Sequence, residues 1–196
     1  MQLSSISFGK KIPVVKGKVK QLETGRFVNV KLYEYDCMDA EDIIEVKNLP
    51  CNKWSFCLPI SNGMVEKKYA REKFSIDTGY SYYTLQDDNK NTVGIVAVKD
   101  SDDYLGVKFI ETDRGSKYKY SGQALLASLA LMALRDKKNI FEIRFPTDEA
   151  IPFYVDKCGF KQENNSMHLS MNPKDMKKFV KRTQKRIHSP LIDIRG

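Results

Sequence analysis

The clearest chemical signal in the sequence is a turn that could bind an anion. A strand pattern from Tyr104 to Thr112 leads into a polar, basic loop from Asp113 to Tyr120, and Ser121-Gly122 then opens a long apolar helix. The first turn of a helix has free backbone N–H groups and the positive end of the helix dipole. A glycine there lets a phosphate approach the backbone closely. The sequence therefore predicts a phosphate site at this turn.

The cysteines and histidines argue against metal chemistry. No Cys-x-x-Cys pair is present, and the two histidines, His168 and His188, are far in sequence from the four cysteines. A zinc site is therefore not expected, nor is a disulfide framework in a chain of this length. We interpret the cysteines as small buried apolar residues and His168 as structural. The cysteines are Cys37, Cys51, Cys57 and Cys158.

The elements that must position the turn form a mixed α/β pattern. Three consecutive strands joined by short polar turns should be antiparallel, whereas the strand, long helix and strand around the turn should be parallel with a right-handed crossover. One mixed sheet covered by helices is therefore expected. The strands are predicted over 11–21, 27–35, 81–85, 92–99, 104–112, 140–145 and 160–171, the helices over 40–49, 64–74, 121–138, 148–158 and from 173 onward, and an aromatic-anchored loop over 51–63.

Composition indicates one globular domain with short terminal additions. The chain has 196 residues, of which 41% are hydrophobic and 30% charged. No apolar run approaches the roughly 20 residues of a membrane span, and the N-terminus lacks a signal-peptide core, so the expected location is the cytoplasm. We predict an N-terminal extension or edge hairpin over 1–26, a central domain over 27–171, and a basic amphipathic helix and tail over 172–196.

Most of the positive charge lies in that last segment. Residues 173–196 hold eight Lys and Arg against two Asp, which is +6 of the total +8. One interpretation is a helix packed through Met176, Phe179 and Val180 with its lysines in solvent. Two alternatives are a surface for nucleic acid or an acidic partner, and a membrane-surface role. Interleaved aromatic residues are lacking, so base recognition is not indicated.

Two stretches resemble the GNAT superfamily of acyl-CoA-dependent N-acyltransferases, and the resemblance extends over roughly 27–171. One is the strand, loop and helix from Val107 to Leu134. The other is Ala150–Phe160, which is similar to the family segment Ala-x-x-Phe-Tyr-x-x-x-Gly-Phe. The chain departs from the family's Arg/Gln-x-x-Gly-x-Gly/Ala loop. Lys117 stands at its first position, Tyr120 replaces the first glycine, and Gly122 matches the last. Thr147 replaces the family's Asn.

The resemblance implies a binding site for acyl-CoA between two strands that separate at their ends. In such a fold the pantetheine arm pairs with the strand before the loop, and the pyrophosphate lies on the helix turn. By position, Tyr154 would donate a proton to the leaving thiolate. The implied CoA-binding residues are Ile110, Thr112, Lys117, Tyr118, Lys119, Tyr120, Ser121, Gly122, Gln123, Ala124 and Thr147.

The attacking amine must be neutral, so a base is expected near the end of the central strand. Glu111 is the first candidate and Glu142 the second, with a solvated or sheet-edge carboxylate as the alternative for each. The acceptor opening would be formed by the first two helices and the loop with Trp54 and Phe56. A small amine, a protein amine and an aminoacyl-tRNA all remain open as acceptors.

The sequence thus predicts an acetyltransferase that moves an acetyl or short acyl group from acetyl-CoA, or another short acyl-CoA, to a primary amine. Neither a metal nor a membrane span is expected, and the oligomeric state is left open. One alternative is a non-catalytic module of the same fold that binds acyl-CoA or a partner, which the altered loop favours. Another is a nucleic-acid-associated protein that uses the basic C-terminal helix.

Overall fold

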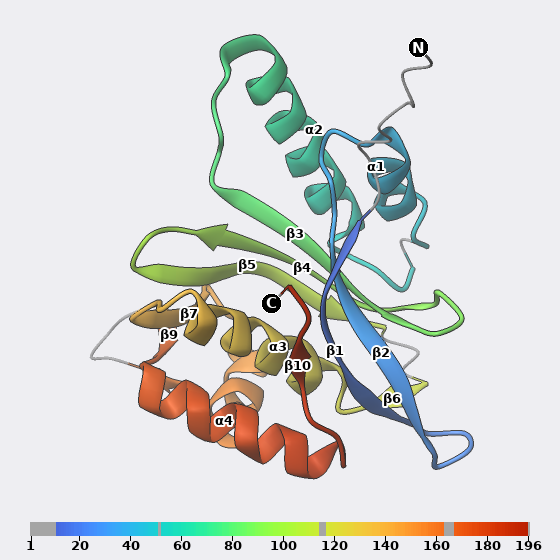
Figure 1. Cartoon of the computed structure of the whole chain (residues 1–196), viewed down its shortest axis with the longest axis vertical. Coiled ribbons are helices and arrows are strands. Elements are labelled where there is room, and N and C mark those ends of the chain that lie inside the picture. Colours follow the sequence, from blue (N-terminus) through green and yellow to red (C-terminus); the bar gives the residue numbers. More distant parts are fainter. Residues whose placement is uncertain (1–10, 51, 114–116, 163–166, 196) are drawn as a thin grey trace, which may run out of the picture.

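The computed structural model describes residues 11–50, 52–113, 117–162 and 167–195. Within them, one sheet of ten strands carries helices on both faces (Figure 1). In chain order the elements are β1 (Ile12–Gln21), β2 (Phe27–Glu34), α1 (Ala40–Lys47), α2 (Cys57–Phe74), β3 (Tyr80–Asp87), β4 (Thr92–Asp100), β5 (Tyr104–Thr112), β6 (Tyr118–Lys119), α3 (Ser121–Arg135), β7 (Ile140–Arg144), the short helical turns η1 (Asp148–Ala150) and η2 (Phe153–Cys158), β8 (Lys161–Gln162), β9 (His168–Met171), α4 (Pro173–Arg186) and β10 (Ile192–Asp193).

The sheet topology confirms the predicted mixed sheet. Its strand order is β10-β1-β2-β3-β4-β5-β7-β9-β8, with β6 paired to β1. Strands β3, β4 and β5 are antiparallel neighbours, as their short connections require. Strand β7 pairs with β5 in parallel after the crossover through α3. The turn at Ser121-Gly122, where a phosphate site is predicted, therefore lies within the one parallel step of the described sheet.

The sheet buries a separate apolar core on each face. Helices α3 and α4 pack on one face and α1 and α2 on the other, as Figure 1 shows. Because side chains alternate along a strand, Tyr83 joins the α3 core while its neighbour Tyr82 joins the α2 core. Helix α3 is apolar around most of its circumference, and eleven of its fifteen residues are buried. It is therefore the central element of the larger core.

Strands β5 and β7 pair over only part of their length. Their register runs from Tyr104↔Ile140 to Val107↔Ile143 and then stops, while β5 continues to Thr112. A β-bulge lies at the same place, because Lys108 is skipped between Ala97↔Phe109 and Val98↔Val107 in the β4 register. Among the described residues, the edge of β5 from 108 to 112 therefore has no strand partner on the β7 side. This is the predicted separation of the two strands.

The start of α2 differs from the sequence prediction. We expected a loop until Gly63, whereas the helix begins at Cys57. Pro59 falls in the first turn, where the missing N–H has no intrahelical acceptor to lose. Gly63 reflects close packing on the sheet, because a Cβ there would lie 2.5 Å from Tyr82 Oη. Tertiary contacts thus decide this boundary against the local turn signals.

Other boundaries hold or shift for identifiable reasons. Asp39 caps α1 and Asn172 caps α4, each through its side chain, and both are residue types that favour this position. The helix predicted over 148–158 is present, but it changes form along its length: it begins as the 3-10 turn η1, is α-helical at 151–152, and continues as the π-helix η2, with Gly159 as its C-cap. No helix in the described part of the chain is long and apolar enough to cross a membrane.

Candidate active site

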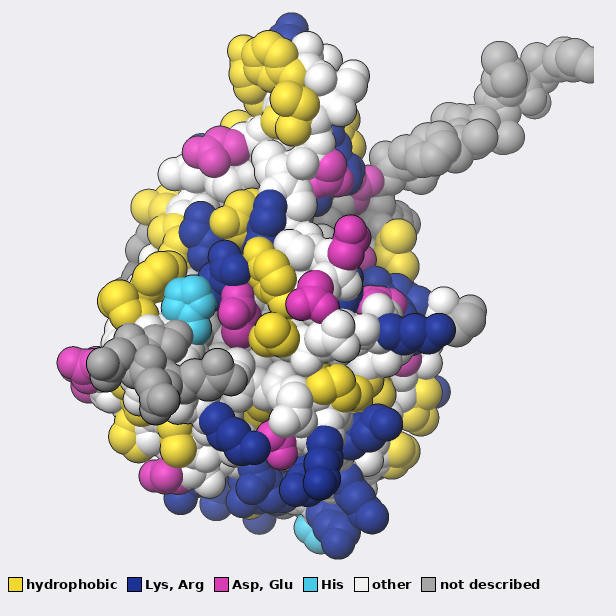
Figure 2. Space-filling model, turned by 90° about the vertical axis from the view of Figure 1, so that its left-hand side faces the viewer, with side chains coloured by type: hydrophobic (Ala, Val, Ile, Leu, Met, Phe, Trp, Pro, Cys, Tyr) yellow, Lys and Arg dark blue, Asp and Glu magenta, His cyan; other side chains and the backbone are white. Residues whose placement is uncertain are grey.

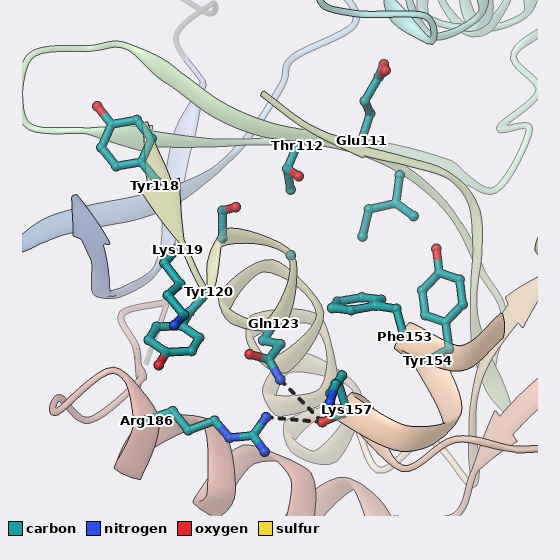
Figure 3. Close-up of a pocket in the computed structure, with 13 residues that line it drawn as sticks. Glu111, Thr112, Tyr118, Lys119, Tyr120, Gln123, Phe153, Tyr154, Lys157 and Arg186 are labelled. Carbon is teal, nitrogen blue, oxygen red and sulfur yellow. Dashed lines mark hydrogen bonds between the residues drawn. The ribbon is translucent and has the colours of Figure 1, made fainter. Parts of the chain in front are cut away.

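A cavity of about 700 Å³ opens where β5, α3 and η2 meet. Figure 3 shows the residues that line it, which come from these elements, from β6 and from α4. A volume of this size lies in the usual range for ligand pockets, roughly 300–1,000 Å³. Its lining consists of Ile110, Glu111, Thr112, Tyr118, Lys119, Tyr120, Ser121, Gly122, Gln123, Phe153, Tyr154, Lys157 and Arg186.

The first turn of α3 forms one wall of the cavity. Tyr120 precedes the helix with φ 71°, a left-handed conformation that glycine adopts without strain and that other residues adopt at a cost of about 1–2 kcal/mol. Tyr120 therefore adopts the left-handed backbone conformation that glycine would adopt at this position. The Tyr120 ring packs against the larger core, the main core of the protein, which contains α3. The Lys119 ammonium lies 5.2 Å from the centroid of this ring. In Figure 3 the ring lies toward Arg186.

Gly122 keeps the space between α3 and η2 open. A Cβ at this position would lie 3.2 Å from Phe153 Cζ and 3.9 Å from Thr112 Cγ2. The first of these contacts is tight enough that the ring would have to move. A larger side chain at 122 would therefore fill the cavity beside the helix start.

The loop before α3 is held by the N-terminal strand. Strand β6 pairs with the end of β1, with Tyr118 opposite Gln21, and the amide of Leu22 donates to the Lys117 carbonyl at 2.7 Å. The Tyr118 hydroxyl donates to the Asp87 carboxylate at 2.7 Å. These contacts fix one side of the cavity. No sequence motif predicted them.

Tyr154 lies on η2 with its side chain 7% exposed. Burial, with a smaller contribution from Cys158, raises its pKa to about 12. The phenol is therefore protonated at neutral pH, as a proton donor must be. Its ring packs edge-on against Phe153 and Phe160. In Figure 3 the hydroxyl points toward β5.

The two candidate bases lie in different places. Glu111 lines the cavity, and its Oε2 accepts from the backbone N–H of Phe56 at 2.9 Å, just before α2. Figure 3 shows Glu111 and Thr112 leaving β5 on opposite sides, so the carboxylate faces α2. Glu142 is outside this cavity. It pairs with Arg144 and lies 3.6 Å from His168 Nδ1, in a smaller cleft beside β9.

Three of the predicted CoA-binding residues do not line the cavity. Lys117 and Thr147 are exposed, and Ala124 is fully buried on the core side of α3. Helical geometry explains Ala124, because it lies only two residues after Gly122 and points about 200° around the helix. Trp54, which we predicted at the opening for the acceptor, is instead buried in the core beneath α2. All other predicted CoA-binding residues line the cavity together with Tyr154 and Glu111.

Sequence reasoning missed Phe153, Lys157 and Arg186. Arg186 belongs to α4 and reaches the cavity from a segment we treated as an addition to the domain. It follows the buried Phe179 by seven residues, which places it at the edge of the apolar stripe, and that spacing is the signal that could have found it. Together with Lys119 and Lys157 it makes the cavity margin basic, which suits a phosphate.

The basic residues continue over the surface of α4. Figure 2 shows Lys and Arg side chains gathered at the end of the molecule where α4 lies in Figure 1. Lys174, Lys177, Lys178, Lys181 and Lys185 are exposed on this helix. In the described part of the chain, no group of three His, Cys, Asp or Glu side chains could hold a metal ion.

Comparison with solved structures shows that the chain has the GNAT fold. SpeG, a spermidine/spermine N-acetyltransferase from Vibrio cholerae, matches with 14% identity over 78% of this chain and 96% of its own, with a TM-score of 0.53. A spermidine N-acetyltransferase chimera of that SpeG and hSSAT matches with 14% identity over 76% and 98%, with a TM-score of 0.56.

A mutant form of KacT also matches, with 12% identity over 76% of this chain and 98% of its own, and a TM-score of 0.53. At such identities the likeness establishes the fold, and substrate and activity must be argued from the site. No protein-family model matches the chain, and no curated protein matches its sequence.

Proposed function

We propose that the protein is an acyl-CoA-dependent N-acyltransferase that moves an acetyl or other short acyl group to a primary amine. The observation that carries this proposal is the cavity itself. It joins the first turn of α3, the end of β5 that lacks a strand partner on its β7 side within the described residues, and the phenol of Tyr154. These are, respectively, a place for a pyrophosphate, for an extended amide-bearing arm, and for a proton donor at the thiol end.

The residues present fit the CoA part of such a substrate. Backbone N–H groups at the start of α3 and the cations Lys119, Lys157 and Arg186 would bind its phosphates. The β7-side edge of β5 over 108–112, which has no strand partner in the part of the chain that the structure describes, would hydrogen-bond the pantetheine amides as an added strand. A backbone N–H of this edge would polarise the thioester carbonyl.

The proposed chemistry is direct transfer. The neutral amine attacks the thioester carbonyl, a C–N bond forms, and the C–S bond breaks. Tyr154 gives its proton to the departing thiolate, and the proton lost by the nitrogen passes through water to Glu111. Solvent then reprotonates the phenol and deprotonates the carboxylate. Glu142 has no place in this scheme, because it lies in another cleft.

We propose that the acceptor approaches from the α2 side of β5, where the Glu111 carboxylate lies. A cleft of about 330 Å³ there is lined by Tyr80, Tyr82 and Phe109 together with Glu66. The Lys108 ammonium also lines this cleft and lies 4.8 Å from the Tyr80 ring centroid, so Glu66 is the lining group that would favour an incoming cation. An amine that arrives as an ammonium suits this cleft, whether it belongs to a small molecule, a protein or an aminoacyl-tRNA. It would release one proton to solvent to become the neutral nucleophile before it attacks.

One observation favours a second candidate, a module that binds acyl-CoA without turnover. Tyr120 stands where the family loop has glycine, and the cavity margin relies on side-chain cations instead. Isothermal calorimetry with acetyl-CoA tests what both candidates share. We expect saturable binding that weakens with salt, because phosphate contacts contribute to it. No heat of binding at millimolar acetyl-CoA would contradict both candidates and leave a nucleic-acid role for the basic helix.

A further inference from the structure

The turn that carries Tyr154 is held at its end by side chains from outside it. The last carbonyls of a helical turn find no N–H donor within the turn, so their hydrogen bonds must come from donors outside it. Arg182 Nη2 donates to the Cys158 carbonyl at 2.6 Å. The Lys157 carbonyl accepts from Arg186 Nη1 at 3.4 Å and from Gln123 Nε2 at 3.3 Å. Figure 3 shows these two bonds meeting at Lys157.

The turn η2 depends on such support. Together with the helical residues 148–152 that precede it, the stretch has eleven residues, too few to be stable as an isolated helix. At its end the Gly159 amide donates to the carbonyls of Tyr154 and Val155, and the Phe160 amide donates to that of Tyr154. The backbone of Tyr154 thus lies within the segment that the two α4 arginines hold.

Helix α4 can serve as a rigid support. Met176, Phe179, Val180 and Thr183 bury one face of it in the main core. Arg182 follows Phe179 by three residues, so the anchored face and the guanidinium lie on adjacent positions of the helix surface. A charged donor held in this way makes a stronger hydrogen bond to a carbonyl than a neutral one does.

Gly159 makes room for the arginine. Its φ of 87° suits glycine, and a Cβ there would lie 3.1 Å from Arg182 Nη2. The same glycine therefore ends η2 and lets the guanidinium reach the Cys158 carbonyl.

We propose that Arg182 and Arg186 are positioning residues that set the place of Tyr154 in the active site. This proposal rests on the proposed function, because it gives the arginines a catalytic consequence. Arg186 also lines the cavity, so its substitution would affect CoA binding as well. Arg182 is not among the lining residues and contacts the turn alone in the hydrogen bonds described. A substitution of Arg182 therefore tests the positioning of Tyr154 separately from CoA binding.

Hydrogen exchange of the full-length protein tests the physical half of the proposal. In Arg182→Ala we expect the amides of residues 158–160 to exchange about tenfold faster than in the wild type, since a charged hydrogen bond to the turn is lost. Residues 40–47 of α1, on the other face of the sheet, should not change. Lys181→Ala is the matched control, because it removes one exposed positive charge from the adjacent position.

Steady-state kinetics test the catalytic half. Arg182→Ala should lower kcat about tenfold through misplacement of the phenol, with the KM for acetyl-CoA unchanged. Arg186→Ala should lower kcat and also raise that KM. Arg182→Lys keeps one charged donor, so it should restore part of the lost kcat and of the exchange protection. It also decides the question if Arg182→Ala fails to fold.

The outcomes separate this inference from the proposed function. Unchanged exchange at 158–160 in Arg182→Ala would overturn the inference even if the enzyme is active. Faster exchange with the same kcat as Lys181→Ala would overturn the positioning role in catalysis. If the wild-type protein transfers no acyl group, the proposed function fails and the catalytic role of the arginines fails with it. The exchange result still decides whether they hold the turn.

Discussion

At the scale of single residues, Tyr154 is the group on which the proposed chemistry depends most. It is buried, held in its neutral form, and directed toward β5. Tyr154→Phe removes one oxygen and keeps the ring contacts with Phe153 and Phe160. We expect kcat to fall about tenfold or more with unchanged affinity for CoA. Turnover equal to that of the wild type would remove Tyr154 from the mechanism.

The raised pKa of Tyr154 also predicts a pH dependence of stability. The unfolded phenol ionises near pH 10, whereas the folded one ionises near pH 12. Its contribution to stability is therefore complete below pH 10 and is lost as pH rises from 10 to 12. Urea unfolding of the wild type and Tyr154→Phe at pH 8, 10 and 11 measures this. The stability difference between them should shift against the wild type by about 1 kcal/mol from pH 10 to 11.

Glu111 has a structural contact and a proposed catalytic role, and two substitutions separate them. Glu111→Gln keeps an oxygen that can accept from the Phe56 amide, but it cannot act as a base. We expect it to fold with normal stability and to lose about tenfold in kcat. Glu111→Ala should also destabilise the start of α2 by about 1 kcal/mol. A fully active Glu111→Gln would leave Glu111 with the structural contact alone.

At the scale of elements, the start of α3 is where the phosphate site is tested. Gly122→Asp would place a side chain against Phe153 and a negative charge beside the proposed pyrophosphate. We expect affinity for CoA to fall by about tenfold or more. Ser75→Asp adds the same charge at the far end of α2, where left-handed backbone suits Asp, and should bind normally. Retained affinity in Gly122→Asp would place the anion site elsewhere.

Local sequence predicted the elements whose signals are local. The cap at Asn172 and the antiparallel strands with short turns follow from neighbouring residues, and the structure contains them. The predicted start of α2 was wrong because Pro59 lies in the first turn of the helix, where proline is tolerated, and Gly63 allows close packing on the sheet. Arg186 was missed for the same kind of reason, since its place at the cavity depends on how α4 packs against η2. Contacts between distant elements are not encoded in any short window.

At the scale of the whole molecule, the basic charge of α4 has a partial structural explanation. Arg182 and Arg186 reach carbonyls of η2, whereas lysines such as Lys177 and Lys181 lie exposed. If these lysines bind nucleic acid, affinity should fall steeply with salt. Binding of a labelled oligonucleotide measured at 50 and 200 mM salt checks this. Binding that ignores salt, or none at low salt, would contradict such a role.

The central claim is that the cavity between β5, α3 and η2 transfers an acyl group to an amine. Release of CoA from acetyl-CoA, measured with a thiol reagent against a panel of amines, tests it most directly. The panel should include spermidine and spermine, a lysine-bearing peptide and an aminoacyl-tRNA. We predict release that requires one class of amine and falls about tenfold in Tyr154→Phe. Tight binding of acetyl-CoA with no release for any amine would contradict the claim and leave a module that binds without turnover.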